Sequence, residues 1–237
     1  MSADLDKQTI NTDIINFIIK KLDPSIYDTI YDPVMPSSSF LNEIIMFINK
    51  LHYNINWSQF PKIINGSTYS NIIESQVNMQ LNKINTSTRF NNTIYSPMEE
   101  KYDVIMTHVT HKEVYYINHC INSMKIVSRC AIVIDQSFLI NDTSEYIDVR
   151  KKLIENFSTR IMLILGTNLC IIFFNNTMHS TDKLYIYDLY ENNGSLVVSY
   201  NMIINTKWLL ENNYLFNNIS QKMDDIPLSL IFDDNYV

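Results

Sequence analysis

The sequence predicts one α/β domain with a mainly parallel sheet, helices on both faces and an antiparallel edge. Helical patterns alternate with short β-branched runs, and this order is typical of a parallel sheet. Two later runs, Ile132–Ile134 and Cys170–Phe174, are continuously apolar, as expected of strands buried on both faces. The 237 residues, 46% of them hydrophobic, are enough to bury one full-sized core.

The first part of the chain predicts helices and short strands in turn. Apolar residues spaced by three and four predict a helix over Thr12–Leu22, capped by Thr12 or Asp13 and stopped at Asp23-Pro24. The next expected elements are a strand at Thr29–Pro33, a helix at Phe40–Leu51, a strand at Ile63-Ile64 and a helix from about Ser70 to Asn82.

The second part predicts two further helices and several strands. The expected elements are a strand at Tyr102–Met106, a helix around Lys112–Met124, a strand at Arg129–Ile134, a helix at Tyr146–Glu155, and strands at Arg160–Leu165, Leu169–Phe174 and Leu184–Leu189. The last three strands have no helices between them, which predicts antiparallel pairing at one edge of the sheet. Asn192-Asn193-Gly194 predicts a hairpin turn. We expect residues 1–237 to form a single domain, with an N-terminal helical segment at 1–28 and a C-terminal helix and tail at 207–237.

Composition narrows the classes of function. The net charge of −7 argues against a strong independent hold on nucleic acid, and the short basic segment Arg150-Lys151-Lys152 is interpreted as a solvated helix face. No run approaches the roughly 18 apolar residues that cross a bilayer, and the polar N-terminus is not a signal peptide, so no membrane partner is expected. Cys120, Cys130 and Cys170 are widely spaced without a CxxC motif, which predicts buried thiols and an intracellular location.

Glycine is unusually scarce. Only Gly66, Gly166 and Gly194 occur in the chain, whereas about 7% is ordinary usage. Loops that hold phosphates and nucleotides need glycine, because the backbone must turn sharply and approach the ligand. The composition therefore indicates few such loops.

Several motifs together resemble a known family. Asp32, Pro33, Phe40 and Leu41 match the frame of a "DPxxGxGxFL" loop, and "YDVIMTHVTH" matches the strand and loop "FDVxxxNPPF". The strongest match is "CAIVIDQSFLINDTSEYIDVRKKLIENFSTRIMLIL", which begins at Cys130. This pattern resembles the catalytic domain of adenine-N6 DNA methyltransferases, in the modification subunit of type I restriction–modification enzymes. The resemblance covers about Thr9 to Asn218 and implies a Rossmann-like S-adenosylmethionine-dependent methyltransferase fold.

The loop that would hold the cofactor departs from the family. The resemblance implies that S-adenosylmethionine lies at the carboxyl ends of the first strands. The positions that match its loop contain no glycine, and Pro36 removes a backbone amide. A carboxylate for the ribose is also missing, because Glu74 is the only acid between Glu43 and Glu99. We therefore expect no cofactor binding at the matching positions, which are Asp32, Pro33, Met35, Pro36, Ser37, Ser38 and Phe40.

The catalytic loop departs further. In the family, an Asn-Pro-Pro-aromatic motif accepts hydrogen bonds from the adenine amino group and stacks on the flipped base. The matching residues here are His108, Val109, Thr110 and His111, so the amide acceptor and both prolines are replaced. We expect no catalytic residue at these four positions.

Three groups of residues suggest a metal, nucleoside or acid/base site, and each also has a simpler structural interpretation. His108 and His111 form H-x-x-H with His119 nearby, but no glutamate has the H-E-x-x-H spacing, so no metal is expected. Asp32-Pro33 is interpreted as a loop-entry turn, and contact with a nucleoside is the alternative. Glu113 is interpreted as a helix N-terminal carboxylate rather than an acid/base partner of His111.

Three hypotheses of function follow. In the first, the chain is a catalytically inactive pseudoenzyme without cofactor, and a structural or regulatory subunit that docks on an active methyltransferase or a viral assembly. We expect an intracellular location, in the cytoplasm, a viral factory or a virion. The richness in Asn, Ile and Tyr suggests an AT-rich coding genome, and a large DNA virus is the suggested source. In the second, it is a divergent active enzyme that uses S-adenosylmethionine, with His108 in place of the amide. In the third, it binds nucleic acid through the old substrate cleft.

Overall fold

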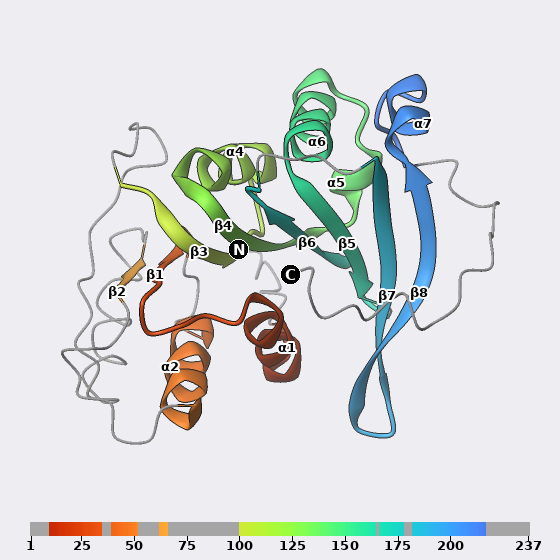
Figure 1. Cartoon of the computed structure of the whole chain (residues 1–237). Helices are drawn as coiled ribbons and strands as arrows, with labels where there is room; N and C mark the ends of the chain where they lie inside the picture. The colour runs from red at the N-terminus through yellow and green to blue at the C-terminus, as the bar shows by residue number, and fades with distance from the viewer. Residues whose placement is uncertain are drawn as a thin grey trace, which may run out of the picture.

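The computed structural model describes residues 10–34, 39–51, 62–65, 100–164, 166–177 and 182–216. Within these ranges, eight strands form one sheet in the order β2-β1-β3-β4-β6-β5-β7-β8 (Figure 1). The strands are β1 (Thr29–Asp32), β2 (Lys62–Asn65), β3 (Tyr102–His108), β4 (Met124–Asp135), β5 (Ser158–Ile164), β6 (Leu169–Asn175), β7 (Lys183–Asn192) and β8 (Ser195–Asn205).

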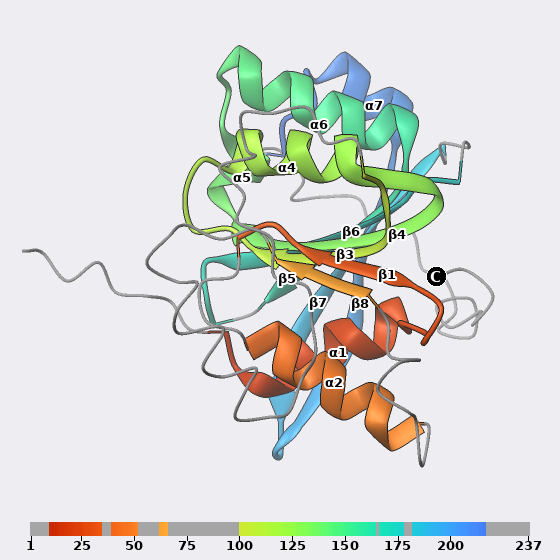
Figure 2. The ribbon, with the colours of Figure 1, turned by 90° about the vertical axis from the view of Figure 1, so that its left-hand side faces the viewer.

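Helices cover both faces of this sheet, as the sequence predicts. Figure 2 shows α1 and α2 on one face and α4, α5, α6 and α7 on the other. The helices are α1 (Thr12–Leu22), α2 (Ser39–Leu51), α4 (Glu113–Ser123), α5 (Ser137–Ile140), α6 (Ser144–Asn156) and α7 (Thr206–Glu211).

The sheet is parallel on one side and mixed on the other. β2, β1, β3 and β4 pair in parallel, and β8 forms the predicted antiparallel edge with β7. A further antiparallel strand, β6, lies inside the sheet between β4 and β5. The sequence predicts this strand but gives no sign of its interior position.

Each face of the sheet has its own apolar cluster. Val104 and Met106 of β3 lie in the cluster beneath α1 and α2, whereas Ile105 lies in the cluster that includes buried residues of α4 and α6. This alternation follows from the two-residue period of a strand. Burial of both faces explains the near-continuous apolar sequences of β4 and β6.

Local signals set the ends of α1 and β4. The cap of α1 is Asn11, whose side chain accepts from the Asp13 amide at 3.0 Å, so the predicted caps Thr12 and Asp13 are wrong by one or two residues. Asp23 ends the helix in the left-handed region before Pro24. β4 starts five residues earlier than predicted, through a stretch in which Val127 is exposed and has φ of 62°.

The interpretation of Arg150-Lys151-Lys152 as a solvated helix face is wrong for its first residue. Arg150 is 1% exposed, so it is not part of a solvated helix face, whereas Lys151 and Lys152 are exposed. Its guanidinium donates to the carbonyls of Tyr214, Phe138 and Asn141, at 2.8, 2.5 and 2.6 Å. Arg150 therefore ties α6 to α5 and to the segment after α7.

Several predictions concern other parts of the chain. The expected helix at 70–82 and the tail after Phe216 lie outside the described residues. The three cysteines are buried and free, as predicted. No helix in the described ranges is long and apolar enough to cross a membrane.

Candidate functional site

The carboxyl ends of β1 and β3 lie close together because these strands pair in parallel. Thr107, fully buried in β3, donates its hydroxyl to Asp32 Oδ1 at 2.8 Å. The Val34 amide donates to the same oxygen at 3.1 Å, so Asp32 also forms the turn that follows β1. Asp32 is 7% exposed, and these bonds stabilise its carboxylate in the interior.

His108 ends β3 as a buried, uncharged side chain. It is 6% exposed, and Nε2 has no hydrogen-bond partner within the described part of the chain. Burial lowers the pKa of His108 to about 4, because the charged imidazolium loses its hydration. Near neutral pH the ring therefore has one donor and one acceptor nitrogen and no net charge.

Val109 directly follows β3 and is still bonded to the neighbouring strand. Its amide donates to the Val133 carbonyl of β4 at 2.9 Å. Its side chain is 1% exposed and belongs to the same apolar cluster as Ile105 and Ile117. Both the backbone and the side chain of Val109 thus serve the core.

The next two residues are exposed at the surface. The Thr110 hydroxyl and His111 Nδ1 share a hydrogen bond of 3.1 Å. The His111 ring lies edge-on to Tyr116 of α4, with centroids 6.1 Å apart and an interplanar angle of 89°. The ring at the aromatic position of the motif therefore packs against the helix that follows it.

The third histidine has a different environment. His119 Nε2 and the Tyr31 hydroxyl share a buried hydrogen bond of 2.8 Å, and Tyr31 stacks on Tyr102 with centroids 4.4 Å apart. Burial lowers the pKa of His119. Among the described residues, no group of three or more His, Cys, Asp or Glu side chains is arranged to hold a metal ion.

The structure describes part of the predicted cofactor loop. Pro33 is buried, and Phe40 packs in the cluster beneath α1 and α2. Asn65 ends β2 in register with Asp32, so an amide residue stands at the end of the second strand of the sheet. The other predicted positions, Met35, Pro36, Ser37 and Ser38, lie outside the described residues.

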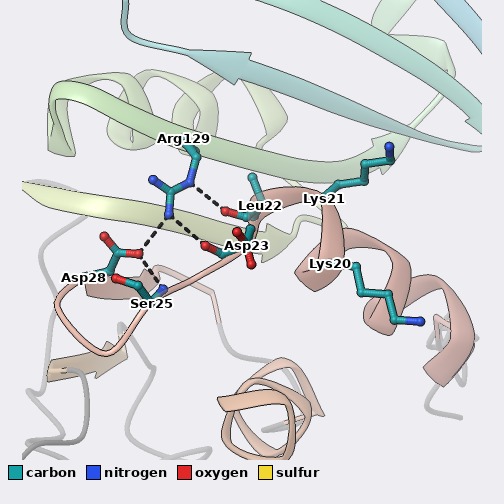
Figure 3. A pocket seen from close by; sticks show the side chains of 7 residues that line it. All are labelled: Lys20, Lys21, Leu22, Asp23, Ser25, Asp28 and Arg129. Carbon is teal, nitrogen blue, oxygen red and sulfur yellow. Dashed lines mark hydrogen bonds and ion pairs between the residues drawn. The ribbon is translucent and has the colours of Figure 1, made fainter. Parts of the chain in front are cut away.

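A cavity of about 460 Å³ lies at the opposite end of β1 (Figure 3). Arg129 of β4 donates to the carbonyls of Leu22 and Asp23 at 2.6 and 3.2 Å, and to Asp28 at 2.8 Å. The Ser25 amide donates to the same Asp28 oxygen at 2.7 Å. These bonds satisfy carbonyls at the end of α1 and anchor that helix to β4, which is a structural role.

Sequence reasoning missed two buried hydrogen bonds of the candidate site. The Tyr31–His119 pair joins residues 88 apart in the sequence, and no spacing in the chain indicates it. The Thr107–Asp32 bond joins residues 75 apart. The only sequence signal of this bond is that each of the two residues follows directly on a short apolar run.

One family model matches most of the chain. The family model described as N-6 DNA methylase matches residues 47–207, which is more than half of the chain. The sequence matches no curated protein.

Solved structures share the fold at low sequence identity. A modification subunit of a type I restriction enzyme from Vibrio vulnificus YJ016 is 15% identical, with a TM-score of 0.68, over 81% of this chain and 49% of that one. The M protein of the type I restriction enzyme EcoKI is 18% identical, with a TM-score of 0.68, over 79% and 49%. A structure of a type I restriction–modification system reaches a TM-score of 0.74 at 15% identity, over 94% and 61%. The chain thus spans about half to three fifths of their length.

Proposed function

We propose that this chain, which belongs to the N-6 DNA methylase family and has the Rossmann-like fold of S-adenosylmethionine-dependent methyltransferases, is a catalytically inactive member of that family. In this proposal it serves as a structural or regulatory subunit of a larger assembly. Function depends on the residues of a site rather than on the fold, so the proposal rests on the end of β3.

One observation carries the proposal. The Val109 amide donates to the Val133 carbonyl, and the Val109 side chain is buried in the core. By the resemblance, a proline stands at this position in an active member, and proline has no amide to donate. At the position where an active member would have this proline, the chain has a residue whose amide bonds to β4 and whose side chain packs in the core.

The neighbouring residues point the same way. His108 replaces an amide side chain that can donate and accept at once, and its ring is buried. His111 replaces the stacking aromatic residue, and it contacts Thr110 and Tyr116 of its own chain. Together, three substitutions replace the amide side chain, the first proline and the stacking aromatic residue that the motif has in the family.

The cofactor side supports the same proposal. Asn65 stands at the end of β2, where a ribose ligand would need a carboxylate, and the loop after β1 contains no glycine. In the family, glycine at these positions lets the backbone turn sharply and approach the cofactor.

The proposed partner is another protein, either an active methyltransferase or a viral assembly. The similar solved structures include modification subunits of type I restriction enzymes, and one concerns complex assembly in such a system.

A methyl-transfer assay tests the proposal. The full chain is incubated with S-adenosylmethionine labelled in its methyl group and unmethylated duplex DNA, beside an active adenine methyltransferase as the positive control. We expect no incorporation above the level without protein. Incorporation into adenine N6 would overturn the proposal.

One observation favours a second candidate, a divergent but active adenine methyltransferase. His108 Nε2 is buried and has no hydrogen-bond partner among the residues described here. A neutral imidazole nitrogen can accept one hydrogen bond from an exocyclic amino group. This candidate predicts incorporation that His108→Ala abolishes and that His111→Ala, in an exposed side chain, leaves largely intact.

A further inference from the structure

The outer edge of β8 is an uncharged strand edge. β8 is last in the order of the described sheet, and the strand paired with it there is β7. Its sequence, "SLVVSYNMIIN", contains no charged residue and no proline over residues 195–205. Natural edge strands are usually protected by lysine, proline or bulges, because an open edge pairs with other strands.

The charges of this hairpin lie on the inner strand. β7 contains Lys183, Asp188 and Glu191, whereas the outermost strand has none. One bulge interrupts the pairing, at Asn201, whose side chain donates to Asp188 at 2.7 Å. The stretch from Ser195 to Ser199 pairs regularly with β7, and no other described strand pairs with it.

The turn fixes which backbone groups face outward. Asn193 and Gly194 have φ of 50° and 75°, so they form a two-residue turn of type I′, and Asn192 pairs with Ser195. In such a hairpin the closing pair is hydrogen-bonded, and hydrogen-bonded and non-hydrogen-bonded pairs then alternate. The amides and carbonyls of Leu196 and Val198 therefore face away from β7.

We propose that β8 pairs antiparallel with β8 of a second copy of this chain, so that one sheet continues across a homodimer. A two-fold interface places the same segment on both sides, and such contacts require a self-complementary surface. An uncharged strand meets this requirement, because pairing with itself brings no like charges together. For the same reason β8 has no charge with which to attract a charged partner strand. The inference is independent of whether the domain transfers methyl groups.

The association is tested by light scattering after size exclusion, on the full chain over a wide range of concentrations. We expect a mass of two chains that falls toward one chain on dilution. A single-chain mass at every concentration would overturn the proposal, and so would a dimer that the following substitutions leave unchanged.

Proline substitutions at two neighbouring positions distinguish a loss of association through β8 from a loss of stability. Val198→Pro removes an outward amide, so we expect a monomer with the circular dichroism and melting temperature of the parent. Val197→Pro removes an amide that faces β7, so we expect a lower melting temperature. If Val198→Pro also prevents folding, a pair of charge substitutions tests whether the chains associate through β8.

Val197→Lys and Val197→Glu should each be monomeric, and their mixture should form a mixed dimer. Failure of the mixture to associate would contradict pairing through β8.

Discussion

The hydroxyl of Thr107 donates a hydrogen bond of 2.8 Å to the carboxylate of Asp32, which joins the ends of two parallel strands in the interior. Both residues are buried, and Asp32 also accepts from the Val34 amide. In this fold the Asp32 carboxylate stabilises the protein's own turn at the place where a cofactor loop would begin.

Replacement of Thr107 tests this bond. Thr107→Val keeps the shape of the side chain but removes a donor to a buried carboxylate. We expect the free energy of unfolding to fall by about 1–3 kcal/mol. Urea denaturation measures it, with Thr110→Val as the exposed control. Equal stability of the Thr107 variant and the parent would show that the bond contributes nothing.

The pKa of His108 predicts acid sensitivity. Its pKa is about 4 in the fold, against 6.5 for an ordinary histidine, so the unfolded chain binds the proton first. The free energy of unfolding should therefore fall as the pH drops from 6.5 to about 4, by about 3 kcal/mol in total. In His108→Gln this component should disappear, whereas the exposed control His111→Gln should retain it. Unfolding curves at several pH values measure the difference, and a His108 variant that keeps the parental pH dependence would contradict the assignment.

Arg150 should contribute strongly to stability, because its buried guanidinium donates to three backbone carbonyls. Arg150→Lys leaves one ammonium in place of a guanidinium that reaches three carbonyls, so we expect a loss of at least about 3 kcal/mol in the free energy of unfolding. Lys151→Met, at the exposed neighbour, should change it by no more than about 0.5 kcal/mol. Denaturant unfolding of both variants checks the contrast, and a Lys variant as stable as the parent would refute it.

Val127 should be replaceable with a gain in stability. It is a β-branched residue with φ of 62° and 73% exposure, so it has backbone strain without compensating burial. We expect Val127→Gly to raise the free energy of unfolding by about 1 kcal/mol, since glycine adopts this region without the steric cost. Ile126→Gly, at a neighbour whose φ is not positive, should lower the free energy of unfolding. A melting temperature unchanged or reduced in the Val127 variant would contradict the expected strain.

Periodicity predicts the elements of this fold better than their arrangement. The apolar run at Tyr102–Met106 gives β3 correctly, but the strand continues to His108, because its register with β4 extends to Val133 and no glycine or proline stops it. β6 is clear as an apolar run, yet its place inside the sheet depends on long-range pairing. The short helix α5 has too few residues to produce a helical pattern.

The candidate site is predictable in position but not in its contacts. Motif register alone brings Asp32 and His108 to neighbouring strand ends. The polarity of Arg150 predicts exposure, yet the residue is buried. A guanidinium enters the core only where carbonyls from several segments meet, and the sequence does not show that meeting. The unpartnered His108 Nε2 likewise depends on what packs around the ring, which a single sequence does not specify.

Titration calorimetry of the full chain with S-adenosylmethionine, and with its demethylated product, tests the proposed loss of activity most directly. If the cofactor site is lost, neither ligand should give heat beyond that of dilution, and neither should raise the melting temperature. Saturable binding with a micromolar dissociation constant would contradict the account, because it would show that the cofactor site is still functional.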